Sequence, residues 1–409
     1  MRLMLKLILF GMLPLPFTAT GAVPTYCVVG SGQTLCYNNR HEIPAPKPGE
    51  PFYGQDSQFQ GPPPAYRDNG DGTVTDLNTG LMWQKVFDGS RKHTFAEAKA
   101  DASRCQTGGH NDWRLPTIKE LYSLINFSGS MVNNPPRPYL DTNYFDFLYG
   151  DARKDERPID AQFWSATEYV GRTMRGDATV FGVNFADGRI KGYPRDTGPH
   201  GTPFVEFVRY VRGNPAYGTN DFHDNGDGTI SDRATGLVWQ KTDSGKPLDW
   251  QQALAYAEQL KLDGRDDWRL PNAKELQSIV DYHRAPDATD PAWRGPALDP
   301  VFQITEPESY FWSNTTHPEG RPGGPVGELA VYVCFGQSFG FMGPPGAMEK
   351  RRINVHGAGA QRSDPKSGDP KQFPQGRGPQ GDDIRIYNFV RCVRGGLIAG
   401  PGGNADKQN

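Results

Sequence analysis

The chain has 409 residues, and 44 Lys and Arg residues against 47 Asp and Glu residues give a formal net charge of −3. This slightly acidic balance argues against a basic protein that binds nucleic acid. The 49 glycines, 36 prolines and 11% aromatic residues favour loop-rich, strand-containing domains over helical bundles.

The first residues resemble an export signal. Arg2 and Lys6 precede an apolar run at 7–15, and small residues follow at 19–22. This order is typical of a secretory signal peptide, here residues 1–22. The run is too short to span a membrane, and no later run is apolar enough to do so. We therefore expect an exported, periplasmic or extracellular chain without a transmembrane segment, and removal of Arg2 and Lys6 changes the net charge from −3 to about −5.

Two terminal segments have compositions of their own. Residues 23–65 contain several separate prolines and the run Pro62-Pro63-Pro64, which predicts an extended Pro/Gly-rich leader arm lying on the first domain. Residues 397–409 are predicted to form a disordered tail.

The sequence between these segments contains two copies of the same series of motifs. The phrase DNGDGT occurs at 68–73 and 224–229, DWRLP at 112–116 and 267–271, FWS at 163–165 and 311–313, and FVR at 207–209 and 389–391. Four landmarks in the same order indicate a tandem duplication. We expect one repeat domain over 66–213 and a second over 222–396, joined by a short linker.

Each copy has the same order of predicted elements. In the first copy these are strands at 73–76 and 81–83, helices that begin at Thr94 and Thr117, and strands at 163–166, 179–185 and 204–211. Glu97 and Glu120 each follow a threonine by three residues, which is the pattern of a capping box. Asn272 and Glu275 repeat it in the second copy. The order predicts an α+β domain with an antiparallel sheet.

The copies differ most before their last strand, where the second copy carries a long insertion at 343–383. Its Gly, Pro and charged residues predict a loop, and a loop of this length is either functional or disordered. The candidate ligand-binding residues in it are Arg351, Arg352, His356, Gln361, Arg362 and Lys366. The alternative is a solvated insertion without a ligand.

The repeated acidic phrase is the candidate metal site. Calcium is the candidate ion because it prefers hard oxygen ligands, here from Asp68, Asn69, Asp71 and Asp76 and from Asp224, Asn225, Asp227 and Asp232. The spacing does not fit an EF-hand, and Asp and Asn also favour turns by binding their own backbone. The turn interpretation is therefore favoured, and calcium remains the alternative.

Aromatic and arginine residues of the repeated phrases have a structural interpretation. We expect Trp113 and Trp268 in the core, with Arg114 paired to Glu120 and Arg269 paired to Glu275. The FWS strands are also expected in the core. The closing arginines, Arg209, Arg212, Arg391 and Arg394, are expected to form ion pairs.

Five cysteines follow the predicted signal peptide, and export permits disulfides. We expect Cys27 to pair with Cys36 and Cys334 with Cys392, which leaves Cys105. Cys105 and Cys392 are an alternative pair, and the sequence alone does not choose between them.

Together the phrases DNGDGT, TGLMWQK, DWRLP, FWS and FVR resemble the bacterial domain family named for the C-terminal domain of the Legionella collagen-like protein. DWRLP and the closing strand are also similar to C-type-lectin-like domains, including those of formylglycine-generating enzymes. The resemblance implies two tandem C-type-lectin-like domains of α+β class. Each would have two helices on a twisted antiparallel sheet with long loops, its amino and carboxyl ends paired as neighbouring strands.

The family also implies secretion, adhesion-type roles and, for its namesake, binding of sulfated polysaccharides. The chain lacks a Gly-X-Y collagen tract, so trimerisation does not carry over, and its acidic charge argues against a polyanion. The family pattern pairs a cysteine at the Cys105 place with one at the Cys392 place of the same copy, whereas each copy here keeps only one of them.

We therefore expect a non-catalytic exported protein that binds a carbohydrate or a cell-surface protein partner, chiefly through residues 343–383. The first alternative is a structural, envelope-associated module in which that loop covers the domain interface. The second is an enzyme of unidentified reaction. No cofactor other than calcium is expected, and the oligomeric state is left open.

Overall fold

The computed structural model describes residues 24–198, 201–319, 325–343 and 350–396. The predicted signal peptide, 1–22, and the predicted tail, 397–409, lie outside these residues. Within the described ranges, no helix is long and apolar enough to cross a membrane.

A six-stranded antiparallel sheet at the centre of the molecule contains strands of both copies. Its order is β13-β14-β17-β8-β7-β6. The first copy supplies β6 (Gln162–Glu168), β7 (Thr179–Asn184) and β8 (Arg189–Pro194), and the second supplies β13 (Tyr310–His317), β14 (Leu329–Cys334) and β17 (Gln361–Pro365). The two halves meet where Gln361 of β17 pairs with Ile190 of β8.

Each copy also has a smaller four-stranded sheet in which the closing strand pairs with an early one. In the first copy these strands are β3 (Tyr66–Asp68), β4 (Thr73–Asp76), β5 (Leu81–Gln84) and β9 (Val211–Gly213). In the second they are β10 (Phe222–Asp224), β11 (Thr229–Asp232), β12 (Leu237–Gln240) and β18 (Val393–Arg394). The expected pairing of early and closing strands is therefore present in both copies.

The expectation of two helices on a sheet in each of two domains is wrong. Among the described residues, 28% are in strands and 13% in helices, and the strands form five sheets, so the fold is mostly β. The helices are short: α1 (Phe95–Ala102), α2 (Ile118–Ser123), α3 (Trp250–Gln259) and α4 (Ala273–Ser278). The predicted capping boxes do start α1, α2 and α4. The copies also share their largest sheet instead of each building its own.

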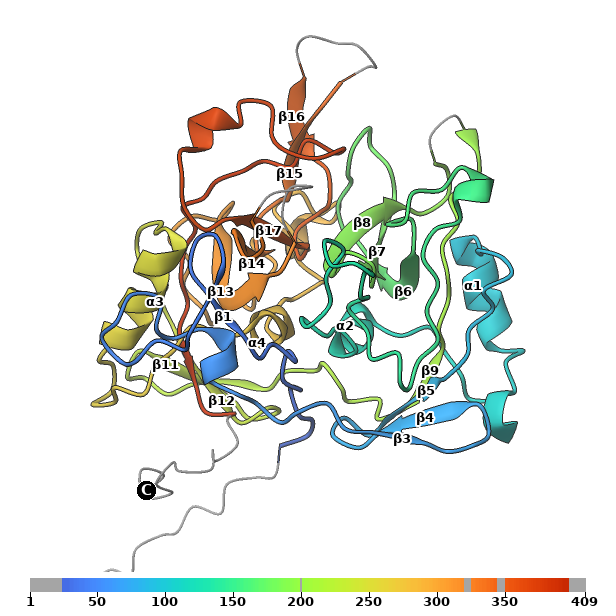
Figure 1. Ribbon diagram of the computed structural model, residues 1–409, viewed down its shortest axis with the longest axis horizontal. Helices are drawn as coiled ribbons and strands as arrows, with labels where there is room; N and C mark the ends of the chain where they lie inside the picture. The colour runs from blue at the N-terminus through green and yellow to red at the C-terminus, as the bar shows by residue number, and fades with distance from the viewer. Residues whose placement is uncertain (1–23, 199–200, 320–324, 344–349, 397–409) are drawn as a thin grey trace, which may run out of the picture.

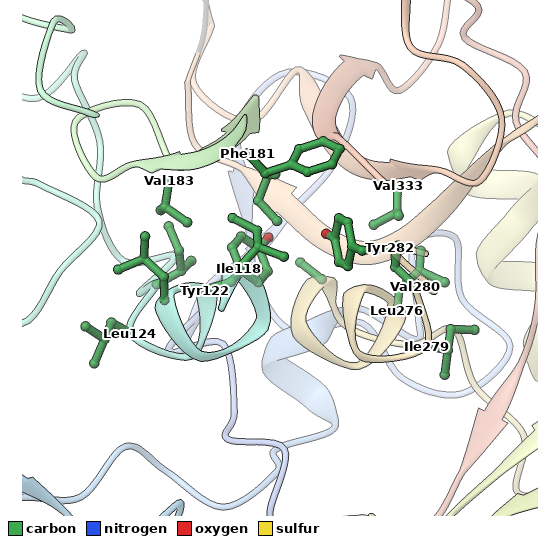
Figure 2. Close-up of a cluster of buried hydrophobic side chains, with 14 of the residues drawn as sticks. Ile118, Tyr122, Leu124, Phe181, Val183, Leu276, Ile279, Val280, Tyr282 and Val333 are labelled. Atoms are coloured by element: carbon green, nitrogen blue, oxygen red, sulfur yellow. The ribbon is translucent and has the colours of Figure 1, made fainter. Parts of the chain in front are cut away.

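Helices α2 and α4 lie side by side beneath the central sheet, as Figure 2 shows. Ile118 and Tyr122 of α2 pack toward Phe181 of β7, while Leu276 of α4 and Val280 just beyond it pack toward β14. These side chains belong to one buried cluster that runs through both copies. The duplication therefore produces one hydrophobic core, with smaller clusters beneath α1 and α3.

The repeated aromatic phrases are core, as expected. Trp113 and Trp268 are 4% and 3% exposed, and the Phe and Trp of both FWS strands are fully buried.

The closing arginines divide into two kinds. Arg212 and Arg394 form the expected ion pairs with Asp112 and Asp267.

Arg209 and Arg391 do not pair with carboxylates in the way the sequence suggested. Both are fully buried, and both donate to backbone carbonyls. Arg209 binds the carbonyls of Gln84, Lys85 and Asp146, and Arg391 binds those of Gln240, Lys241, Thr242 and Gln303. Burial lowers the pKa of Arg209 to about 9 and that of Arg391 to about 10.

The leader arm, whose described part is 24–65, crosses both copies and lies chiefly on the second (blue in Figure 1). It carries the short hairpin β1 (Cys36–Tyr37) and β2 (Glu42–Ile43). Tyr26 N donates to Ala234 O of the second copy, and Phe127 N of the first copy donates to Ser31 O. The arm therefore connects the two copies instead of lying on the first alone.

Residues 343–383 are largely built into the fold. They include β16 (Arg351–Asn354), which pairs with β15 (Phe339–Met342), and β17 of the central sheet. Residues 344–349 lie outside the described ranges. The insertion is therefore the source of a central strand, and not simply a long surface loop.

Candidate functional site

A groove of about 1180 Å³ lies where the first copy meets the second. One wall is formed by the turn before α2 together with the end of β6, and the opposite wall by 279–283, just after α4. Linker residues between 215 and 222 close one side. We call this space the first-copy groove, and the lining residues that matter below are Arg114, Lys119, Glu120, Ala166, Thr167 and Tyr282.

An ion pair lies in the wall of the first-copy groove. The Arg114 guanidinium binds both carboxylate oxygens of Glu120, with an Nη1–Oε2 distance of 2.6 Å, as the sequence predicted. Glu120 also accepts from Thr117 N at the start of α2. The Glu120 side chain is buried, whereas the Arg114 side chain is 36% exposed. A ligand in the groove can therefore reach the guanidinium while the carboxylate stays bound.

The equivalent ion pair of the second copy is covered. Arg269 binds Glu275 at 2.7 and 2.6 Å, but its side chain is only 2% exposed. The ring of Phe59, from the leader arm, lies 6.0 Å from the Arg269 guanidinium carbon, and Arg269 also donates to Gly395 O. The two repeats thus build the same pair, and the leader arm helps to cover one of them.

The sheet edge beside each ion pair is likewise covered by the leader arm in the second copy and open in the first. Thr167 and Thr315 are equivalent because each lies two residues after FWS, and each hydroxyl accepts a backbone N–H from the start of the neighbouring helix, at 2.9 Å in both copies. The Thr315 hydroxyl also donates to Asp56 of the arm. Among the described residues, no hydrogen bond is donated by the Thr167 hydroxyl.

The preceding position completes the edge. Asn314 is fully buried and donates through Nδ2 to Gly54 O of the arm at 3.2 Å. Its equivalent, Ala166, is exposed in the first-copy groove. The backbone hydrogen bond of this residue is the same in both copies, since Ala166 N donates to Pro116 O and Asn314 N to Pro271 O. The open edge of the first copy therefore has the shape of the covered edge, without the arm.

The opposite wall follows the same symmetry. Tyr282 lines the first-copy groove, and its equivalent, Phe127, donates its backbone N–H to Ser31 O of the arm at 2.8 Å. Gly32 follows with φ +80°, and a Cβ there would lie 2.4 Å from Asn126 Oδ1. Only glycine lets the arm pass this point without a shift of the neighbouring side chain.

Burial shifts the pKa of one charged group at each of the two sites. Burial raises the pKa of Asp56 to about 6 in the covered site, although the Thr315 hydroxyl opposes the shift. In the wall of the open groove, burial lowers the pKa of Lys119 to about 8. Its ammonium donates to Asn220 Oδ1 and Ser278 O.

The ligand-binding residues predicted in the insertion are mostly inaccessible. Arg351 and Arg352 are exposed on β16, and Arg352 pairs with Asp383 at 2.8 Å. The other four predicted residues are buried: His356, Gln361, Arg362 and Lys366.

The buried members make internal contacts instead. His356 Nε2 lies 2.9 Å from Asp382 Oδ1, and Arg362 donates to the same carboxylate. Burial lowers the pKa of His356 to about 4. Lys366 donates to Thr316 Oγ1 and, in the arm, to Asn38 O.

The repeated acidic phrases form turns. Asp68 accepts from Gly70 N and pairs with Lys85, while Asp71 accepts from Thr73 N; Asp224 and Asp227 repeat these bonds in the second copy. Asn69 and Asn225 bind neighbouring hydroxyls, and Asp76 and Asp232 accept backbone N–H groups of the next turn. The described residues contain no group of three or more His, Cys, Asp or Glu side chains placed to hold a metal ion.

The expected disulfides are absent from the described residues, where all five cysteines are free. Cys36 Sγ contacts Ser57 Oγ at 3.1 Å, whereas Cys27 lines a separate cavity with Thr79. Cys334 and Cys392 are buried among the apolar side chains beneath α3 and do not form a disulfide with each other. Cys105 contacts Thr107 and Gln84 in the first copy.

One phrase that often marks an esterase nucleophile is also present, Gly336-Gln337-Ser338-Phe339-Gly340. Ser338 is 1% exposed and lies between two strands, β14 and β15, and not at the strand-to-helix turn that exposes such a serine. Its carbonyl, rather than its hydroxyl, accepts from His356 N. We assign it no role in a reaction.

The sequence does not predict the first-copy groove. It predicts the ion pair of the wall residues Arg114 and Glu120, but nothing local in the sequence distinguishes Arg114 from Arg269. The signal lies in tertiary structure: the single leader arm covers one of two equivalent sites.

A comparison with protein-family models finds a family that matches both copies. The family model described as the Lcl C-terminal domain matches residues 72–211 and again 228–344. Searches of curated proteins and of solved structures gave no significant match. Two tandem matches that cover more than half of the chain agree with the duplication and with the repeated phrases. The chain therefore belongs to the Lcl C-terminal domain family.

Proposed function

We propose that the protein is a non-catalytic binding protein that acts outside the cytosol and holds its ligand in the first-copy groove. The observation that carries the proposal is the contrast between the two copies. One site is filled by a segment of the same chain, and the equivalent site is an open groove of about 1180 Å³. The ligand is a carbohydrate or a cell-surface partner.

The groove has the mixed lining that such a ligand requires. The partly exposed Arg114 provides donors, Tyr282 and Phe222 provide aromatic surface, and Ala166 leaves room at the strand edge. Binding sites typically combine apolar surface with a few placed polar groups in this way. The Glu120 carboxylate is held by Arg114 and Thr117, which supports a binding role for this wall rather than acid–base chemistry.

Blocking the groove tests the proposal. Ala166→Trp places an indole in the groove, and Ala152→Trp makes the same change at an exposed position of the first copy outside its lining. Both variants and the unchanged protein are screened on glycan and peptide arrays after their melting midpoints have been compared. We expect at least one ligand to be lost with Ala166→Trp and kept with Ala152→Trp. If every captured ligand binds Ala166→Trp as well as the unchanged protein, the groove is not the site.

A structural role is the second candidate, and one observation favours it for the insertion. Asn354 Nδ2 donates to Arg172 O in the first copy, and Met174 N donates to Asn354 O. Arg189 of β8 donates to Ser363 Oγ of β17. We propose that residues 350–366 serve to join the copies. If so, Asn354→Ala lowers the melting midpoint and leaves array binding unchanged.

A further inference from the structure

The leader arm shows what chemistry the repeat accepts at this site. Six arm residues lie at the second-copy site or on its walls: Ser31, Gly32, Gln33, Gly54, Asp56 and Phe59. They form an extended or irregular chain with one short 3₁₀ turn at 56–58. The occupant of one of two equivalent sites is thus known, and it is a polypeptide.

Two side chains of the arm contact features that the copies share. The Asp56 carboxylate accepts from the Thr315 hydroxyl, and Phe59, three residues later, lies over the Arg269 guanidinium. In the first copy, Thr167 and Arg114 hold the same places in the repeated phrases, and both line the open groove. An acceptor and an aromatic ring at this spacing would meet the same two partners.

The arm also recognises the main chain of an outer strand in the second copy. Gln33 binds the backbone of Thr316 twice, donating to its carbonyl at 2.7 Å and accepting from its N–H at 2.9 Å. Thr316 lies on β13, an outer strand of the central sheet, and the equivalent outer strand is β6. The equivalent residue is Glu168, which lines the first-copy groove. The open site therefore presents a strand edge, which suits an extended polypeptide.

We propose that the first-copy groove binds an extended polypeptide segment of a partner protein. The segment carries an Asp, or another carboxylate or amide acceptor, for Thr167, and an aromatic residue three positions later for Arg114. This inference rests on the proposed function and names its ligand class. The arm of the same chain cannot serve both sites at once, because its residues 54–59 already occupy the second.

The probe is a synthetic peptide with the sequence of residues 52–60, Phe-Tyr-Gly-Gln-Asp-Ser-Gln-Phe-Gln. Binding to the full-length protein is measured by titration calorimetry or fluorescence anisotropy. We expect a Kd of about 1 mM or tighter. Replacing the Asp or the second Phe of the peptide by Ala should weaken binding at least about fivefold.

Two protein variants locate the probe. Ala166→Asn restores the amide that binds Gly54 O in the second copy, and we expect it to tighten binding about threefold to tenfold. Ala166→Trp should abolish binding, and Ala152→Trp should not. Melting midpoints of all three variants are compared first, and the gain with Ala166→Asn cannot be caused by misfolding.

Each remaining outcome decides against the inference. A peptide that binds Ala166→Trp unchanged has displaced the arm from the second copy or bound elsewhere. A peptide that binds neither the unchanged protein nor Ala166→Asn overturns the ligand class. In that case the proposed function still stands if a glycan, or another array ligand without this pattern, is lost with Ala166→Trp, so the two failures are distinguishable.

Discussion

Lys119 and Lys274 make the same hydrogen bond in opposite directions across the junction of the two copies. Lys119 Nζ donates to Ser278 O at 2.7 Å, and Lys274 Nζ donates to Ser123 O at 2.8 Å. Each lysine precedes the Glu of its RLP phrase, and each serine ends the facing helix, α4 or α2. Residue i of one copy binds residue j of the other and the reverse holds, which is the pattern of a twofold homodimer interface. Here it lies within one chain.

The reciprocal bond predicts a pH-dependent loss of stability in Lys274→Met. Burial lowers the pKa of Lys274 to about 7, from 10.5. Between those values the unfolded chain binds more protons than the folded one, so this lysine's contribution to the free energy of unfolding rises with pH. Met fills a similar volume but leaves Ser123 O unpaired, which costs about 1–3 kcal/mol. Urea denaturation should show a larger loss at pH 9 than at pH 6.

Lys119→Met is the matched control, because the pKa of Lys119 is lowered only to about 8. The loss of stability in Lys119→Met should begin to grow about one pH unit higher than the loss in Lys274→Met. If either variant shows the same loss at both pH values, the lysine does not titrate between the folded and unfolded states as described.

Equivalent Arg→Ala substitutions in the covered and the open ion pair should lower the free energy of unfolding by different amounts. Arg269→Ala leaves the buried Glu275 carboxylate without its partner, and such a loss typically costs about 3–5 kcal/mol. Arg114 is 36% exposed, so water can solvate Glu120 in Arg114→Ala. That loss should be closer to the ~1 kcal/mol of an exposed pair. Equal shifts of the urea midpoint would show that the leader arm does not shield Arg269.

Local features of the fold could be predicted because their causes are local. A capping box needs only Thr117 and Glu120, and a turn needs only residues 69–72, so both were found from spacing alone. The ion pair of Arg114 with Glu120 also lies within one phrase. Because the motifs are repeated, each of these predictions applies to the second copy as well as to the first.

The shared sheet could not be predicted, because β17 carries no apolar alternation. It reads Gln361-Arg362-Ser363-Asp364-Pro365, and four of these residues are buried. Arg362 is held by Asp382, and Asp364 accepts N–H groups from Arg385 and Ile386. Hydrogen-bonded polar groups can be buried in this way, but their partners are not adjacent in the sequence.

The arm's position was missed for a similar reason. Asp56 and Thr315 are 259 residues apart, and the Pro-rich composition predicts extension without indicating which copy it contacts. The open groove follows from that position, so it was missed as well.

The free cysteines predict a thiol reactivity pattern. An alkylating reagent should label Cys27 and Cys105, which are partly exposed, in the native protein. Cys36, Cys334 and Cys392 are buried, so a reagent should reach them only after unfolding. Mass spectrometry without a reductant should count five labels on the unfolded chain. Three or fewer labels would mean that a disulfide forms.

Asp56 predicts how docking of the leader arm depends on pH. Burial raises the pKa of Asp56 to about 6, from 3.8, with Glu275 adding to the shift and Arg269 opposing it. Between those values the folded chain binds more protons than the unfolded one, so the contribution of Asp56 to stability falls as the pH rises from about 4 to about 6. Asp56→Asn keeps an acceptor for Thr315 but does not titrate. Relative to the unchanged protein, the variant should therefore gain stability across this window, by about 1–3 kcal/mol above pH 6. Urea midpoints at pH 4 and pH 7 measure the difference, and a constant offset between the two proteins would contradict the assignment.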